Sequence, residues 1–253
     1  MKTMKMLWVA LIVLPSVAFS ATDYSTDFEG SEFVVNQSVN GIDGWVDSTN
    51  DDIIRDASYD TWGTHGKYLT CWGTNALAYA PTLDTSAKSK VNISLDYRPA
   101  DGTTGGNSGG YVGLYGSGTD DCGVTLIRFD STGVDTGNIV ATDGGDDNFI
   151  TIGTWTFVDS NTNYHFDMVV DNVNKTTSVS IDGGNAVLLA WGGSWGSAVS
   201  SGTFEQLWFR GGLNETRAMT AIDDISIVSV PEPATLCLLL AGAGIAAFKR
   251  RKG

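Results

Sequence analysis

Hydrophobic and polar residues alternate with a period of two along much of this chain. In the clearest run, from Val91 to Arg98, apolar side chains at the odd positions alternate with polar ones at the even positions. This pattern predicts a β-strand with one face in a core and the other in solvent. Further runs that predict strands are Tyr24–Phe28, Lys67–Trp72, Tyr111–Tyr115, Val124–Asp130, Tyr164–Asp171, Thr176–Ile181, Phe204–Arg210 and Ala221–Val230.

Turn sequences separate these runs, and no segment of the body shows a sustained helical period. The turn signals are Asn40-Gly41, Asp101-Gly102, Asp143-Gly144-Gly145 and Asp182-Gly183-Gly184. Many short strands with 31 glycines and no helix favour two packed sheets. We therefore predict an all-β fold, an antiparallel two-sheet jelly-roll sandwich.

The first twenty residues have a different pattern from the body. Lys2 and Lys5 precede an apolar segment from residue 6 to 17, and small residues stand at Ala18 and Ser20. This is the pattern of a secretory signal peptide, residues 1–20, cleaved after Ser20. The body, residues 21–229, then has the length of one domain with a sizeable core.

The last segment, residues 230–253, has three parts in a fixed order. Pro231, Glu232 and Pro233 come first, an uncharged apolar run from 234 to 248 follows, and four cations end the segment: Lys249, Arg250, Arg251 and Lys252. The run predicts a helix of roughly 22 Å at 1.5 Å per residue, which is short for a hydrocarbon layer of about 30 Å. The cations would hold its end on the cytoplasmic side. The alternatives are an ordinary membrane anchor and a buried apolar helix.

This three-part tail resembles the PEP-CTERM sorting signal of bacterial exported proteins. The resemblance implies a transient stay in the inner membrane, recognition by an exosortase-type processing protease, and cleavage near the Pro-Glu-Pro triplet. It also implies release to the cell surface or the extracellular space, with an extracellular polysaccharide matrix or biofilm as the setting.

Several short motifs of the body resemble known jelly-roll modules. A strand signal, a polar turn at 174–176, a second strand signal and the Asp182-Gly183 turn resemble the central hairpin of concanavalin-like and laminin-G-like sandwiches. Asp27-Phe28-Glu29 near the start and the run from Ala221 to Ile225 resemble the opening and closing motifs of the MAM domain. The resemblance implies that the first and last strands lie side by side.

Adjacent chain ends would bring four carboxylates together and so suggest a cofactor. If Asp27 or Glu29 lay opposite Asp223 or Asp224, their oxygens and nearby carbonyls would suit one calcium ion. The alternative is that these acids cap turns or face solvent.

The charge of the chain limits the kinds of partner that it can bind. The net charge is −14, and six of the fifteen cations lie in the two ends, so the body is more acidic still. Nucleic acid is excluded as a natural partner, because its phosphates would be repelled.

Cys237 lies in the tail, which leaves Cys71 and Cys122 as a candidate disulfide in an oxidising compartment. The alternative is two small buried side chains.

The sequence contains no marked catalytic constellation. Laminarinase-like glycosidases of this fold carry Glu-x-Asp-x-Glu on one strand, and no such triplet occurs here. The two histidines, His65 and His165, are a hundred residues apart and are interpreted as hydrogen-bonding surface residues. No serine or cysteine has a sequence-marked partner. We therefore predict that the protein is not an enzyme.

Tryptophans in glycine-rich segments suggest a binding role. Trp191 and Trp195 lie in one such segment, and Trp62 begins a Trp-Gly-Thr triplet. Indole faces held on a rigid sandwich stack on sugar rings, although the same residues would also fill a core. The leading hypothesis is an exported structural or carbohydrate-binding protein with extracellular polysaccharide as its partner. The alternatives are a secreted polysaccharide-degrading glycosidase and a protein-adhesion module.

Overall fold

The structure is a computed structural model, and it describes residues 21–49, 52–58, 62, 65–72, 77–100, 109–116, 123–144, 148–159, 161–192, 202–212 and 219–231. Within these residues every regular element is a β-strand. The strands are β1 (Ala21–Thr26), β2 (Val46–Asp47), β3 (Ile53–Asp56), β4 (Lys67–Trp72), β5 (Leu77–Tyr79), β6 (Lys88–Arg98), β7 (Tyr111–Gly116), β8 (Thr125–Gly133), β9 (Thr136–Thr142), β10 (Phe149–Thr156), β11 (Tyr164–Asp171), β12 (Thr176–Ile181), β13 (Val187–Ala190), β14 (Phe204–Arg210) and β15 (Met219–Pro231).

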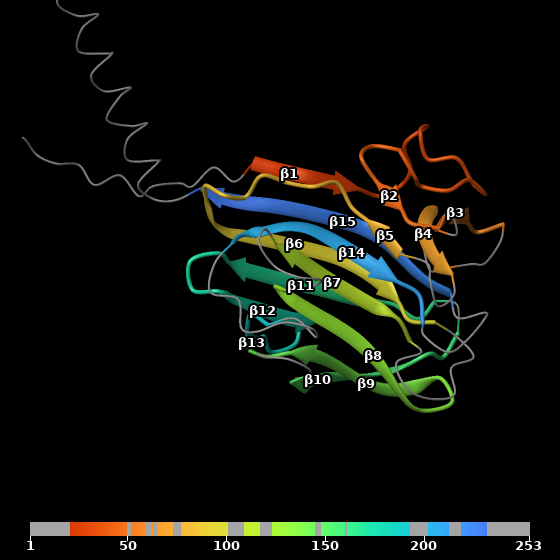
Figure 1. Ribbon diagram of the computed structural model, residues 1–253. Coiled ribbons are helices and arrows are strands. Elements are labelled where there is room, and N and C mark those ends of the chain that lie inside the picture. Colours follow the sequence, from red (N-terminus) through yellow and green to blue (C-terminus); the bar gives the residue numbers. More distant parts are fainter. Residues whose placement is uncertain are drawn as a thin grey trace, which may run out of the picture.

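The strands form two antiparallel sheets that pack face to face (Figure 1). Sheet A has eight strands in the order β13-β12-β11-β6-β15-β4-β3, with β1 also paired to β15. Sheet B has seven strands in the order β10-β9-β8-β7-β14-β5-β2. The predicted antiparallel two-sheet sandwich is confirmed.

Alternation along each strand builds the core between the sheets. On β6, Val91, Ile93, Leu95 and Tyr97 are all buried, as the period of two predicts. The Tyr97 ring stacks on Phe129 of β8 with ring centroids 4.6 Å apart, which joins the two sheets directly. Burial of many such side chains from both inner faces is the main force that holds the sandwich together.

The last strand, β15, lies inside sheet A and pairs with three other strands. Its first half pairs with β4, its second half pairs with β1, and β6 runs along its other edge. The first and last strands are therefore side by side, as expected from the resemblance to jelly-roll modules. The register against β6 shifts between Asp223 and Ser226, where one extra residue forms a β-bulge. Asp224 lies in this bulge with a φ of +49°.

Both ends of the chain lie outside the described residues. The predicted signal peptide, residues 1–20, stays a prediction, and so does the helix of the tail, because the description ends at Pro231. In the described part of the chain no helix is long and apolar enough to cross a membrane.

Candidate functional site

The site begins with a row of three polar side chains across sheet A. His165 on β11 pairs with Asp96 on β6, and Asp96 pairs with Asp223 on β15. The residues next to them along each strand, such as Leu95, Phe166 and Ile222, point into the core. Because side chains alternate between the two faces of a strand, His165, Asp96 and Asp223 lie on the outer face of the sheet. Antiparallel pairing thus places side by side three residues that are remote in sequence.

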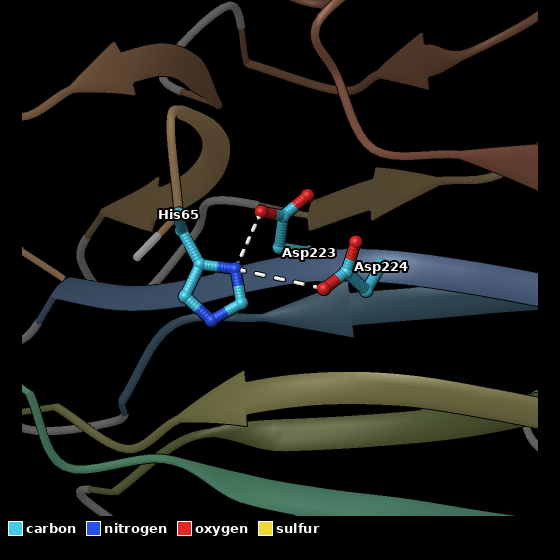
Figure 2. Close-up of side chains that lie close together, drawn as sticks. All are labelled: His65, Asp223 and Asp224. Carbon is cyan, nitrogen blue, oxygen red and sulfur yellow. Dashed lines mark hydrogen bonds and ion pairs between the residues drawn. The ribbon is translucent and has the colours of Figure 1, made fainter. Parts of the chain in front are cut away.

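The bulge on β15 adds Asp224 to this row, and the loop before β4 adds His65. Figure 2 shows the imidazole of His65 directed at both carboxylates. Its Nδ1 lies 2.7 Å from Oδ2 of Asp223 and 3.8 Å from Oδ2 of Asp224. Asp223 is almost fully buried and Asp224 is exposed. The loop and the bulge together make a compact group of one imidazole and two carboxylates.

Asp96 connects the two histidines. Its Oδ1 lies 2.6 Å from Nδ1 of His165, and its Oδ2 lies 3.4 Å from Nε2 of His65. The amide of Asn163 also donates to Oδ2 of Asp96, at 2.9 Å. Both histidines of the sequence, which were interpreted as separate surface residues, therefore share one carboxylate.

Trp62 covers His65. The two rings stack with centroids 4.1 Å apart, and the Trp62 indole nitrogen donates to the carbonyl of Thr162 at 3.2 Å. The guanidinium of Arg98 lies 5.8 Å from the Trp62 ring and 5.9 Å from the Tyr68 ring. These contacts fix the imidazole over the bulge.

The surroundings change the protonation of this group. Burial raises the pKa of Asp223 to about 6, although its hydrogen bond to His65 acts in the opposite direction. Burial disfavours the charged form of His65, but the hydrogen bond and charge of Asp223 and the charges of Asp96 and Asp224 raise its pKa above the ordinary value. The pKa of His165 is also raised, mainly by its hydrogen bond to Asp96.

An open groove lies next to this row on the outer face of sheet A. It has a volume of about 450 Å³, and its outward-facing lining comes from β6, β11 and β15: Asn92, Ser94, Asp167, Val169, Ser226 and Val228. Ser94 pairs with both Asp167 and Ser226 across the strands. A polar row of Asp167, Ser94 and Ser226 therefore lies beside the histidine–aspartate group, and in the next row Asn92 stands between Val169 and Val228.

The structure places the two described tryptophan candidates in the interior. Trp62 is fully buried, and Trp191 is 2% exposed and packs in the main core. Neither ring has a face open to a sugar, so the stacking role predicted for these two residues is not supported. Trp195 lies outside the described residues.

The four predicted calcium ligands are only partly brought together. Asp223 and Asp224 are adjacent in the bulge, and Asp27 shares a pocket of about 290 Å³ with Asp224. Glu29 is engaged elsewhere, because its Oε1 accepts a hydrogen bond from the backbone nitrogen of Lys67. Calcium at this position stays a prediction.

Cys71 is a buried free thiol on β4, directed into the core. Burial and the nearby Asp52 raise its pKa well above the ordinary value. Its predicted partner, Cys122, lies outside the described residues, so the disulfide is not seen.

Of the predicted sorting residues, the structure describes Pro231, which ends β15, paired with Lys88 of β6. The others, Glu232, Pro233 and the four terminal cations, lie outside the described residues.

Comparison with known proteins identifies the tail. Residues 229–252 match the model of the PEP-CTERM protein-sorting motif. The motif marks an exosortase-sorted protein that is exported across the inner membrane to the cell surface or the extracellular space. No curated protein sequence matches the chain.

Solved structures resemble the body at low sequence identity. A sialidase aligns with a TM-score of 0.51 and 12% identity over 82% of this chain, which spans only 18% of that protein's length. The binding domain of Paraclostridial Mosquitocidal Protein 1 aligns with a TM-score of 0.49 and 16% identity over 86% of this chain and 51% of its own. The carbohydrate recognition domain of Emp47p aligns with a TM-score of 0.44 and 10% identity over 84% and 97%. The likeness to the sialidase shows the fold alone.

Proposed function

We propose that this exported surface protein binds a polysaccharide of the extracellular matrix in the groove on the outer face of sheet A, without acting on it chemically. The observation that carries the proposal is the groove itself. Its polar side chains stand on three hydrogen-bonded strands, so their positions are fixed before a ligand arrives. A rigid row of this kind suits a ligand with many hydroxyl groups.

The groove offers both kinds of contact that a sugar ring needs. The Asp167 carboxylate accepts hydrogen bonds from hydroxyls, and the Asn92 amide both donates and accepts. The exposed side chain of Val169 and the half-buried side chain of Val228 supply apolar surface for the C–H face of a ring. This site takes the place of Trp62 and Trp191, whose rings are buried, whereas sugar stacking by Trp195 stays a prediction.

The charge of the chain restricts the class of polysaccharide. A net charge of −14 and a carboxylate in the groove repel uronate-rich or sulfated chains. We therefore propose neutral or amino-sugar polysaccharides as ligands.

The rival function, a glycosidase, requires two carboxyl groups facing each other across a scissile bond. The buried carboxylates nearest the groove, Asp96 and Asp223, are instead hydrogen-bonded to His165, Asn163 and His65. This arrangement favours a binding role. A protein-adhesion module would need an exposed apolar patch in place of this polar row.

The test is a glycan array probed with the purified full-length protein in mild detergent, with calcium and then with chelator. The calcium arm is included because Asp27 and Asp224 share a pocket at the end of β1. We expect binding to neutral or amino-sugar chains, and loss of about tenfold or more in affinity for Asp167→Ala combined with Asn92→Ala.

Asp23→Ala is the matched control, because Asp23 is an exposed carboxylate on the neighbouring strand β1 and does not line the groove. A folded sample that binds no glycan would overturn the proposal. Binding that survives the double substitution would place the ligand elsewhere on the molecule.

A further inference from the structure

We propose that His65, Asp223 and Asp224 form a binding site for one divalent transition-metal ion of the zinc class. The three residues each offer one ligand atom, and these atoms lie within 4.8 Å of one another. They come from the loop before β4 and the bulge of β15, and Figure 2 shows them converging on one point. The site is independent of the proposed polysaccharide groove.

A second observation comes from the carboxylate of Asp223. This residue is 2% exposed, and Figure 2 shows one oxygen of its carboxylate directed at the imidazole of His65. Among the described residues its Oδ1 has no hydrogen-bond partner. A buried carboxylate oxygen that lacks a partner is costly, and a cation held by both oxygens of Asp223 would satisfy Oδ1 as well as Oδ2.

The β-bulge explains how two consecutive residues reach the same ligand. In a regular strand Asp223 and Asp224 would point to opposite faces of the sheet. The extra residue and the positive φ of Asp224 re-aim its side chain towards the same imidazole. The β-bulge therefore brings Asp223 and Asp224 to the same side of β15, where both face His65.

The ligand types select the class of metal. Imidazole nitrogen and carboxylate oxygen are both ligands that Zn²⁺ and related transition-metal ions accept. Calcium prefers six to eight oxygens, and here the nitrogen of His65 is central while Glu29 is engaged by Lys67. Solvent would complete the coordination at the exposed side of Asp224.

Asp96 serves as the positioning residue for the ligand His65. Its Oδ2 lies 3.4 Å from Nε2 of the ring, on the side opposite the carboxylates of the bulge. A metal ion would replace the proton that Nδ1 shares with Asp223, and the remaining proton on Nε2 would face Asp96, as in other carboxylate–histidine–metal arrangements. The Trp62 ring, stacked on His65, fixes the plane of the imidazole.

The experiment measures metal content and affinity directly. Full-length protein is stripped with chelator, dialysed against Zn²⁺, Mn²⁺ or Ca²⁺ alone, and analysed by elemental mass spectrometry and titration calorimetry. We expect one Zn²⁺ per chain and an increase in melting temperature on binding.

The variants separate this site from general binding to an acidic surface. His65→Gln and Asp224→Asn are each expected to weaken Zn²⁺ binding by about tenfold or more. Asp224 is exposed, so its variant is expected to fold normally, which circular dichroism checks. Asp23→Asn is the matched control, because Asp23 is an exposed carboxylate on β1 outside the group of three, and its variant is expected to leave Zn²⁺ binding unchanged.

Three results would overturn the proposal. They are absence of stoichiometric Zn²⁺ in the folded wild type, Zn²⁺ binding that is unchanged in both His65→Gln and Asp224→Asn, and preferential binding of Ca²⁺ that Zn²⁺ does not displace. Glycan binding plays no part in this readout, so failure here leaves the proposed function standing.

Discussion

Replacing Trp62 by alanine tests which role this indole has. A surface tryptophan that stacks on a sugar would lose affinity on substitution at little cost in stability. The structure instead places Trp62 at 0% exposure, stacked on His65 and edge-on to Tyr68 at 5.4 Å. We therefore expect Trp62→Ala to act chiefly on the free energy of unfolding.

The magnitude follows from the contacts that are lost. Removal of a fully buried indole costs about 3–5 kcal/mol. The lost contacts include the hydrogen bond to the Thr162 carbonyl at 3.2 Å and the approach of the Arg98 guanidinium. For a domain of this size the melting temperature should fall by roughly 6–20 °C, at about 2–4 °C per kcal/mol. Trp62→Phe keeps a ring but loses the hydrogen bond, so it should cost about 1–3 kcal/mol.

The assay is urea unfolding of the full-length protein in detergent, followed by circular dichroism and tryptophan fluorescence, with the glycan array run on the same samples. The expected order of stability is wild type, Trp62→Phe, Trp62→Ala. A change below about 1 kcal/mol in Trp62→Ala would refute the reasoning, and loss of glycan binding without loss of stability would restore the stacking role.

Three further predictions concern other parts of the sandwich. Asp96→Asn is expected to lower the pKa of His165 towards 6.5, measured by NMR titration, because the hydrogen bond to Asp96 is the main cause of the raised value; an unchanged pKa would contradict this cause. Since that pKa is raised on folding, the small stabilisation it gives is present below about pH 6.5 and is lost as the pH rises through the folded value. Gly113→Ala should destabilise the fold by about 1–3 kcal/mol, because a Cβ there would lie 1.9 Å from the indole nitrogen of Trp208; an unshifted urea midpoint would argue against this clash. Cys71 should resist alkylation in the native protein and react in urea without reductant, since its thiol is buried and free; a requirement for reductant in peptide mass spectrometry would establish the disulfide instead.

Much of the sandwich follows from alternation alone. The expected strand at 91–98 is part of β6, and the runs at 67–72, 164–171, 176–181 and 204–210 match strands with the same bounds. The short strands β2 and β5 escaped prediction because two or three residues cannot display a period. The strands β9 and β10 also escaped, since their glycines and threonines give a weak pattern.

The candidate site was far harder to predict. The polar phase of two predicted strands correctly places Asp96 and His165 on outward faces, but nothing in the sequence states that these strands pair. His65 reaches Asp223 across 158 positions of sequence. The bulge that turns Asp224 towards the same imidazole depends on register against β6, which is a tertiary property. The carboxylates of Asp223 and Asp224 were singled out, but with a different set of partners.

The sandwich and its sorting motif share three residues. The motif begins at residue 229, whereas β15 continues to Pro231, so no linker separates the last strand from the tail. Any mechanical load on the tail therefore enters the fold along β15. This strand is hydrogen-bonded to β6 on one edge and to β1 and β4 on the other. Tension along it would load many of these hydrogen bonds in shear at once, so the strand that leads into the sorting motif is also one of the hardest to pull out of the sandwich.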